Sequence, residues 1–343
     1  MALPNRLKKV VHSRPVKKVS MALASVFLTL VVVEIVLRLV GYSYTPLSIE
    51  VINNWSEWRF YHSFQDEHFV YDPDLLWRPR PGDPMFNAQG YRGEEVAAEK
   101  RPGSFRIVAV GDSNTLGWRG KDGPSWPGDL QALLREKGGR FTVVNVGVYG
   151  YSSFQGLRRF KEALPLRPDM VLVSFGCNDA MRVTMSDEEF AGRKVRSTGL
   201  DTVLVKFRVG QIFLACSDKI VFNGKEGLVL RVSLRDYEAN LEEIIRIAKG
   251  NKIQVVLLTR PFIDPSIDPS PHKWWWREFA AAYNDATREV GKRGGVPVVD
   301  IYSHFKGRKQ YFVDESHFTK EGHQLAAKII SDRIMPLVPD AVP

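Results

Sequence analysis

Short apolar segments alternate with amphipathic ones through the second part of this 343-residue chain. The apolar segments are rich in β-branched residues and too short for helices, which indicates buried strands. The segment that starts at Ser233 has a serine N-cap and one apolar stripe, as a surface helix does. This alternation predicts a parallel sheet covered on both faces. The expected strands are Arg106–Val110, Thr142–Asn145, Met170–Phe175, Ile253–Thr259 and Val296–Val299, and the expected helices include Ser125–Lys137, Phe154–Ala163, Ser233–Lys249 and Arg277–Arg293.

Residues with chemical function follow the expected strands where each strand ends. Gly111-Asp-Ser alone predicts no more than a capped turn, but three further blocks occupy equivalent places along the chain. Open parallel sheets bind ligands at the carboxyl ends of their strands, so these blocks are expected to meet at one edge. They are Gly111-Asp112-Ser113, Asn145-Val146-Gly147, Gly176-Cys177-Asn178-Asp179 and, beyond the fifth strand, Asp314-Glu315-Ser316-His317.

Taken together, these blocks resemble the SGNH (GDSL-type) hydrolase superfamily over about residues 105–335. The resemblance implies a flavodoxin-like α/β fold, a three-layer α/β/α sandwich with a five-stranded parallel sheet. The N-terminal apolar segment, together with Asn-x-x-Gly-Tyr-Arg at residues 87–92, also resembles bacterial membrane-anchored members of the group.

The resemblance implies a role for each residue of the blocks. Ser113 would be the nucleophile, His317 its general base, and Asp314 the carboxylate that orients the imidazole. The oxyanion hole would consist of the Ser113 and Gly147 N–H groups and the Asn178 side-chain amide. Position 114 departs from the family, with asparagine in place of an apolar residue, and is expected to point away from the chemistry. No metal and no cofactor are expected.

The first forty residues indicate a membrane anchor. Residues 1–18 form a basic tail without an acidic residue, and residues 19–41 are long and apolar enough to span a bilayer. The basic flank predicts a cytoplasmic N-terminus and an extracytoplasmic remainder, so the expected location is the inner or plasma membrane with a single pass. Glu34 and Arg38 lie four residues apart and can pair. A cleaved signal peptide and a buried helix of a soluble domain are the alternatives.

The charge argues against a nucleic-acid partner, and the cysteine content argues against a fold held by several disulfides. The net charge is +9, but six basic residues lie in residues 1–18, which leaves +3 elsewhere and predicts no nucleic-acid partner. The two cysteines are too few for a disulfide framework, although a single bridge between them is possible. Cys177 is expected to be a small buried residue.

The remaining segments complete the domain organisation. Residues 42–104 are aromatic and Pro-rich, and predict an ordered arm with a hairpin that packs on the catalytic domain, residues 105–343. Residues 182–232 and 260–276 are long insertions of the kind that form lids or binding walls. The second ends in Trp274, Trp275 and Trp276, which are candidates to bind substrate by stacking on a sugar, or alternatively to touch the membrane or pack internally.

Location and resemblance together predict a membrane-anchored serine esterase or acyltransferase. Its substrate would be an O-acyl, and preferentially O-acetyl, ester of a cell-surface or exported glycan, with water or a sugar hydroxyl as acceptor. One alternative is a lipid or lysophospholipid esterase. The alternative from another class is a catalytically silent glycan-binding or assembly protein. The oligomeric state is left open.

Overall fold

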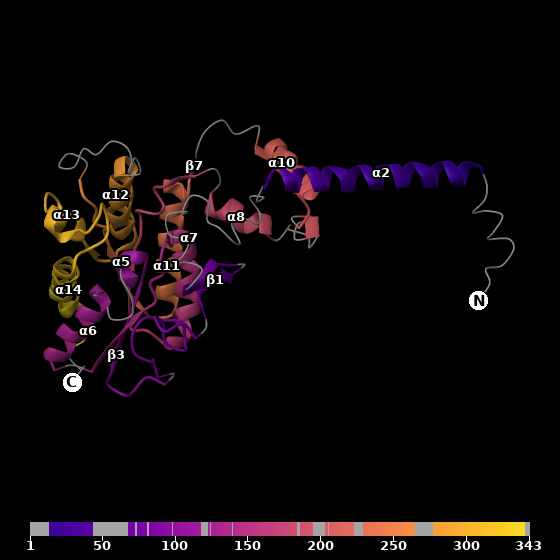
Figure 1. Ribbon diagram of the computed structural model, residues 1–343. Coiled ribbons are helices and arrows are strands. Elements are labelled where there is room, and N and C mark those ends of the chain that lie inside the picture. The colour runs from indigo at the N-terminus through magenta and orange to yellow at the C-terminus, as the bar shows by residue number, and fades with distance from the viewer. Residues whose placement is uncertain are drawn as a thin grey trace. The chain divides into compact units, whose positions relative to one another are not determined.

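The computed structural model describes residues 14–43, 68–117, 123–183, 186–194, 203–222, 229–264 and 277–339, apart from positions 73, 81, 98, 124, 139 and 205. The chain divides into two compact units, Met1–Ser56 with Arg196–Glu226 and Glu57–Val195 with Gly227–Pro343. We call them the helical unit and the sheet unit. The helical unit contains α2 (Arg14–Leu39) and α10 (Arg208–Phe222) (Figure 1).

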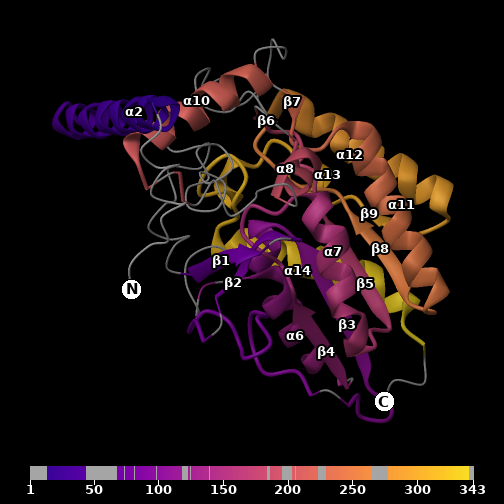
Figure 2. The ribbon, with the colours of Figure 1, turned by 90° about the vertical axis from the view of Figure 1, so that its right-hand side faces the viewer.

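A five-stranded parallel sheet forms the centre of the sheet unit, as predicted. Its strands are β3 (Phe105–Gly111), β4 (Phe141–Asn145), β5 (Met170–Ser174), β8 (Gln254–Leu258) and β9 (Val298–Val299), in the order β4-β3-β5-β8-β9 (Figure 2). The last strand is shorter than expected because the Val296 N–H donates to Gly291 O at the end of the preceding helix. β3 is buried at every position, as a strand covered on both faces must be.

Helices cover both faces of this sheet. On one face, α6 (Trp126–Glu136) and α14 (Lys320–Ile334) pack together over a core that includes Ile107, Leu172 and Val256. The other face carries α7 (Ser153–Ala163), α11 (Leu234–Gly250) and α12 (Arg277–Gly294). The predicted apolar stripe of α11 is buried from Tyr237 to Ala248. The fold is therefore the three-layer α/β/α sandwich that the sequence predicts.

The arm before the sheet contains the expected hairpin. Strands β1 (Phe69–Asp72) and β2 (Leu76–Pro79) pair antiparallel. The Trp77 indole N–H donates to Tyr149 O at 2.9 Å, and the Tyr151 hydroxyl donates to Trp77 O at 2.5 Å. The hairpin is thereby attached to the segment that follows β4. Residues 44–67, which hold several of the arm's aromatic side chains, lie outside the described residues.

The first long insertion begins and ends within the sheet unit. Strands β6 (Arg182–Val183) and β7 (Val229–Leu230) pair antiparallel at its base, with α8 (Asp187–Lys194) following β6. A buried ion pair between Arg231 and Asp187, 2.7 Å apart, holds this base together. The second insertion is described only up to Asp264, so the three tryptophans at 274–276 lie outside the described residues.

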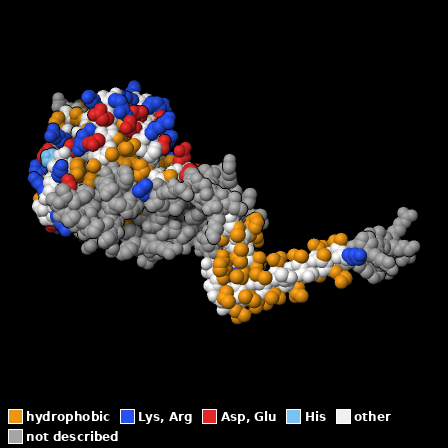
Figure 3. All heavy atoms as spheres, turned by 90° about the horizontal axis from the view of Figure 1, so that it is seen from above, with side chains coloured by type: hydrophobic (Ala, Val, Ile, Leu, Met, Phe, Trp, Pro, Cys, Tyr) orange, Lys and Arg blue, Asp and Glu red, His pale blue; other side chains and the backbone are white. Residues whose placement is uncertain are grey.

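Helix α2 has the length and composition of a membrane span. Its candidate span, Lys18–Leu39, has a mean hydropathy of 2.4 and is not buried against the rest of the chain. The apolar side chains of α2 are exposed along its length (Figure 3). Length and composition alone do not separate an anchor from a signal sequence, since both have an apolar helix near the N-terminus.

Gly156 lies on the buried face of α7 and provides a test of the packing on that side of the sheet. A Cβ atom at this position would lie 2.3 Å from two ring atoms of the buried Phe175 side chain. Gly156→Ala should therefore lower the free energy of unfolding by about 1–3 kcal/mol, although alanine in a helix is ordinarily favoured over glycine by about 1 kcal/mol. Urea unfolding of the full chain in detergent measures the change.

Gly250→Ala is the matched control, because a Cβ atom at the end of α11 would meet nothing within 4 Å. Equal stability of the two variants would contradict the described contact between α7 and Phe175.

Candidate active site

Ser113 lies at a tight turn between β3 and the short helix α5 (Ser113–Leu116). Asp112 is the N-cap, and its Oδ1 accepts a hydrogen bond from the Asn114 N–H at 2.8 Å. The turn requires glycine at position 111, where a Cβ atom would lie 2.0 Å from Thr115 Oγ1 and 2.8 Å from Ser174 O. This sequence therefore places the hydroxyl at the first position of a helix, at the carboxyl edge of the sheet.

The structure brings Ser113, His317 and Asp314 into one hydrogen-bonded series. Ser113 Oγ lies 2.8 Å from His317 Nε2, and His317 Nδ1 lies 2.7 Å from Asp314 Oδ2. Asp314 Oδ1 also accepts from the N–H groups of Ser316 and His317, both at 2.9 Å. Such an arrangement can move a proton from the hydroxyl to the imidazole while the carboxylate balances the charge that forms.

The environment of Asp314 keeps its carboxyl group ionised. Burial opposes the charge, but the hydrogen bonds from the His317 side chain and from two backbone N–H groups outweigh it and lower the pKa of Asp314 to about 2. The imidazole is held from another side by Tyr149, whose ring is nearly parallel to it at a centroid distance of 6.4 Å. Ser113 is 5% exposed and His317 is 9% exposed.

The two other expected oxyanion-hole residues already have hydrogen-bond partners. The Gly147 N–H donates to Asn145 Oδ1 at 3.0 Å, and Asn178 Nδ2 donates to Tyr151 O at 2.9 Å. A Cβ atom at Gly147 would lie 2.5 Å from Leu116 N, so packing against α5 explains the need for glycine there. For Gly147 to bind an oxyanion, its N–H must break the hydrogen bond to Asn145 Oδ1 and donate to the substrate oxygen instead.

Asn114 faces the histidine loop, so the expectation that position 114 points away from the chemistry is wrong. Its Nδ2 donates to Ser316 O at 2.8 Å, and its Oδ1 accepts from the Phe318 N–H at 3.1 Å. The side chain thus bonds to the backbone immediately before and after His317. The Ser316 C=O and Phe318 N–H groups are buried and need hydrogen-bond partners, and the Asn114 amide provides one for each.

Arg260 is a residue of this edge that sequence reasoning missed. Its Nε donates to Asp112 Oδ2 at 2.8 Å and its Nη1 to Ser316 O at 2.9 Å. Burial opposes the positive charge, but the Asp112 carboxylate outweighs it and raises the pKa of the guanidinium. The sequence held one indication of this role. Arg260 is a charged residue two positions after the end of the buried strand β8, just as Ser113 is two positions after the end of β3.

Arg92 connects the arm to the turn that holds Ser113. Its guanidinium donates to Leu116 O and Gly123 O, both at 2.7 Å, and to Gly117 O. Its own N–H donates to Asn145 O at 3.1 Å. Arg92, the last residue of the Asn-x-x-Gly-Tyr-Arg sequence, therefore fixes the end of α5 and the segment after it.

Three other candidate residues are explained by packing. Asp179 accepts from the N–H groups of Ser153 and Gly176, and burial raises its pKa to about 6. His323 is completely buried in α14, where burial lowers its pKa to about 3 and Nδ1 accepts from the Trp126 N–H. Cys177 is buried and unpaired, as is expected of a small packing residue, and burial raises the pKa of its thiol to about 12.

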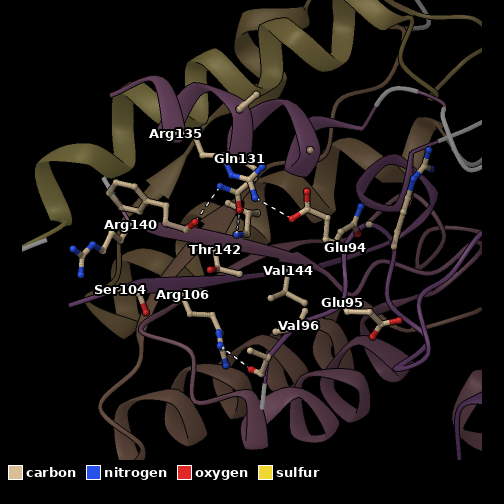
Figure 4. Close-up of a pocket in the computed structure, with 18 of the residues that line it drawn as sticks. Glu94, Glu95, Val96, Ser104, Arg106, Gln131, Arg135, Arg140, Thr142 and Val144 are labelled. Carbon is tan, nitrogen blue, oxygen red and sulfur yellow. Dashed lines mark hydrogen bonds and ion pairs between the residues drawn. The ribbon is translucent and has the colours of Figure 1, made fainter. Parts of the chain in front are cut away.

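A pocket of about 910 Å³ lies between α6, β4 and residues 92–106 (Figure 4). Arg92 and Asn145 line it, but Ser113, Asp314 and His317 do not. The Gln131 side-chain amide pairs there with the outer edge of β4, through Phe141 O and the Val143 N–H (Figure 4). Among the residues that the structure describes, no group of three or more His, Cys, Asp or Glu side chains is placed to hold a metal ion.

Replacement of Asn114 by leucine tests whether its hydrogen bonds to Ser316 and Phe318 keep His317 in place. The change leaves the buried Phe318 N–H without its acceptor, at a cost of about 1–3 kcal/mol, and frees the backbone next to His317. We expect kcat to fall by about tenfold or more with KM little changed, because Asn114 contacts the loop and not the substrate. Steady-state hydrolysis of p-nitrophenyl acetate measures both constants.

Asn114→Asp keeps the acceptor for Phe318 and loses the donor to Ser316, so its kcat should lie between those of the wild type and Asn114→Leu. A kcat that is unchanged in Asn114→Leu, with only the unfolding temperature lowered, would show a merely structural role.

Comparisons with known proteins agree with this architecture. The GDSL-like lipase/acylhydrolase family model matches residues 109–325. An uncharacterized lipoprotein of Bacillus subtilis, YqeF, is 26% identical over 204 residues, which are 58% of this chain and 71% of that protein. An arylesterase of Vibrio mimicus is 30% identical over 112 residues, 31% of this chain and 56% of that protein.

Among solved structures, a lipase/acylhydrolase from Enterococcus faecalis is similar at 22% identity with a TM-score of 0.47, over 68% of this chain and 97% of that one. An acetyl xylan esterase from Geobacillus stearothermophilus is similar at 18% identity with a TM-score of 0.47, over 67% of this chain and 94% of that one. Because the family model covers more than half of the sequence, the chain belongs to the GDSL-like lipase/acylhydrolase family and is an enzyme of the GDSL esterase/hydrolase type.

Proposed function

We propose that this protein is a membrane-anchored, extracytoplasmic serine esterase or acyltransferase. Its substrates are O-acyl esters, and preferentially O-acetyl esters, of a cell-surface or exported glycan. The observation that supports the chemistry is the hydrogen-bonded series from Ser113 Oγ through His317 to Asp314, with distances of 2.8 and 2.7 Å.

The first half of the reaction forms an acyl-serine. Ser113 Oγ attacks the ester carbonyl while His317 Nε2 takes the hydroxyl proton, and Asp314 stabilises the imidazolium. The oxyanion is bound by the Ser113 N–H, the Gly147 N–H and the Asn178 amide. The ester C–O bond then breaks, and His317 returns its proton to the leaving alcohol.

The second half transfers the acyl group to an acceptor. Water or a sugar hydroxyl attacks the acyl-serine carbonyl, and His317 takes its proton. The bond to Ser113 Oγ then breaks, and the serine recovers its proton from His317.

The proposed location depends on α2. Its span of 22 residues is long enough to cross a bilayer, and the basic residues before it favour a cytoplasmic N-terminus. The description of the Bacillus subtilis relative as a lipoprotein is consistent with an extracytoplasmic site of action.

Loss of the Ser113 hydroxyl should abolish the activity. Ser113→Ala is expected to lower kcat/KM for p-nitrophenyl acetate by at least about 10³-fold, and to prevent labelling by a fluorophosphonate. Mass spectrometry of the labelled wild-type chain should locate the adduct on the peptide that contains Ser113. Ser104→Ala, at a serine outside the site, is the control and should keep both properties.

An unlabelled wild-type chain without esterase activity would refute the catalytic proposal and favour the glycan-binding or assembly alternative.

The acyl-group preference separates the glycan proposal from the lipid alternative. We expect acetate release from an O-acetylated polysaccharide, and a kcat/KM for p-nitrophenyl acetate at least about tenfold above that for p-nitrophenyl octanoate, because one methylene in a pocket changes selectivity by a factor of about 10 or more. Preference for the octanoate, together with release of fatty acid from lysophospholipid vesicles, would contradict the proposal and support a lipid esterase.

A further inference from the structure

The segment that contains α10 is bonded to the end of α2, although the two are far apart in the sequence. Glu34 Oε2 accepts from the Val209 N–H at 3.0 Å, and Arg38 Nη2 donates to Lys206 O at 3.2 Å. Arg208 Nη1 donates to Ser43 Oγ at 3.1 Å. All of these contacts lie within the helical unit.

These bonds provide partners for Glu34 and Arg38, the two charged residues that follow Lys18 in α2. Glu34 and Arg38 pair at 2.7 Å, as the sequence predicts, and each also binds the backbone at the start of α10. A carboxylate within a membrane span is costly unless it has partners. A helix N-terminus is a favourable partner, because its first N–H groups lack intrahelical acceptors and its dipole attracts negative charge.

The position of Glu34 along α2 sets the depth at which α10 begins. Glu34 follows the start of the candidate span at Lys18 by sixteen residues, which is about 24 Å of helix at 1.5 Å per residue. The hydrocarbon layer is about 30 Å thick, so the carboxylate and the first turn of α10 lie close to the outer boundary of that layer.

The described part of this segment leaves large apolar side chains exposed. Val203, Phe207 and Phe213 are 51%, 52% and 64% exposed, whereas Gln211 is 6% exposed and Leu214 is 6% exposed. Cys216, one helical turn after Phe213, is also exposed. Lys206 and Arg208 flank Phe207, and anionic lipid headgroups attract such positive charges.

We infer that α10 (Arg208–Phe222) is an interfacial membrane helix and that Phe207, in the bend just before it, and Phe213 are inserted into the outer leaflet between headgroups and acyl chains. The ligand of this surface is a lipid bilayer, and the inference rests on the proposed anchoring by α2. Helices of this kind lie in the plane of the interface with their apolar face buried about 5–10 Å. Because Arg196–Glu226 is inserted between two parts of the sheet unit, the membrane holds the enzyme by a second element.

The native Cys216 thiol allows a direct test in the full-length chain. Cys177 is 4% exposed with a raised thiol pKa, so an NBD maleimide should react at Cys216 alone. The labelled protein is reconstituted in phosphatidylcholine–phosphatidylglycerol vesicles that carry nitroxides at the headgroup or at shallow or deep acyl positions. We expect the shallow nitroxides to cause the greatest loss of NBD emission.

Two reference positions are labelled in a Cys216→Ser background. A probe at Leu28→Cys, on α2, should lose most emission with deep nitroxides, and a probe at Glu136→Cys, on the exposed side of α6, should lose none. Phe213→Asp with the probe on Cys216 should abolish the loss caused by shallow nitroxides while the Leu28 probe is unaffected.

Quenching of the Leu28 probe without quenching at Cys216 would overturn the interfacial helix and leave the anchor intact. Absence of quenching at both positions would refute the anchor, and the present inference with it. Maximal quenching at Cys216 by deep nitroxides would place the segment inside the hydrocarbon and also contradict it.

Discussion

The buried ion pair between Asp112 and Arg260 is the interaction on which the arrangement at the sheet edge depends. Asp112 caps the helix that begins with Ser113, and Arg260 also binds the carbonyl of Ser316, next to His317. One guanidinium thereby joins the ends of β3 and β8 to the loop of the histidine. Removing one partner of such a pair leaves an uncompensated buried charge and costs about 3–5 kcal/mol.

The site also depends on chain outside the family-matched region, which begins at residue 109. Arg92 binds the carbonyl of the last residue of α5 and two carbonyls after it. The indole of Trp77 binds the carbonyl of Tyr149, whose ring is nearly parallel to that of His317. The arm therefore fixes the backbone that follows Ser113 and the residue whose ring lies beside the His317 imidazole. Some of the arm's aromatic side chains, such as Trp77, form the surface by which the arm packs on the sheet unit.

In the helical unit, too, charged side chains have partners that lie far away in the sequence. Glu34 and Arg38 would be unfavourable in an apolar helix alone, but each has a partner within the unit, and α10 obtains a cap from the same carboxylate. In its described part, the insertion that the sequence suggests as a lid or binding wall is bonded to α2 within the helical unit. Pairing of these charged groups with each other and with the backbone before and at the start of α10 explains why the two segments associate.

The sequence by itself indicated the five strands of the central sheet, apart from the start of the last one, the main helices that cover it, and the layer order. Its resemblance to a family named the three residues of the hydrogen-bonded series. Periodicity, caps and glycine turns depend on residues close in sequence, and the topology of parallel sheets then brings their carboxyl ends together. Only the tertiary structure decided the partners of Asn114, Arg260 and Arg92, and showed that the Gly147 N–H is already bonded. Asn114 and Ser316 are 202 residues apart, and no local pattern indicates which buried donor will meet which acceptor until the chain is packed.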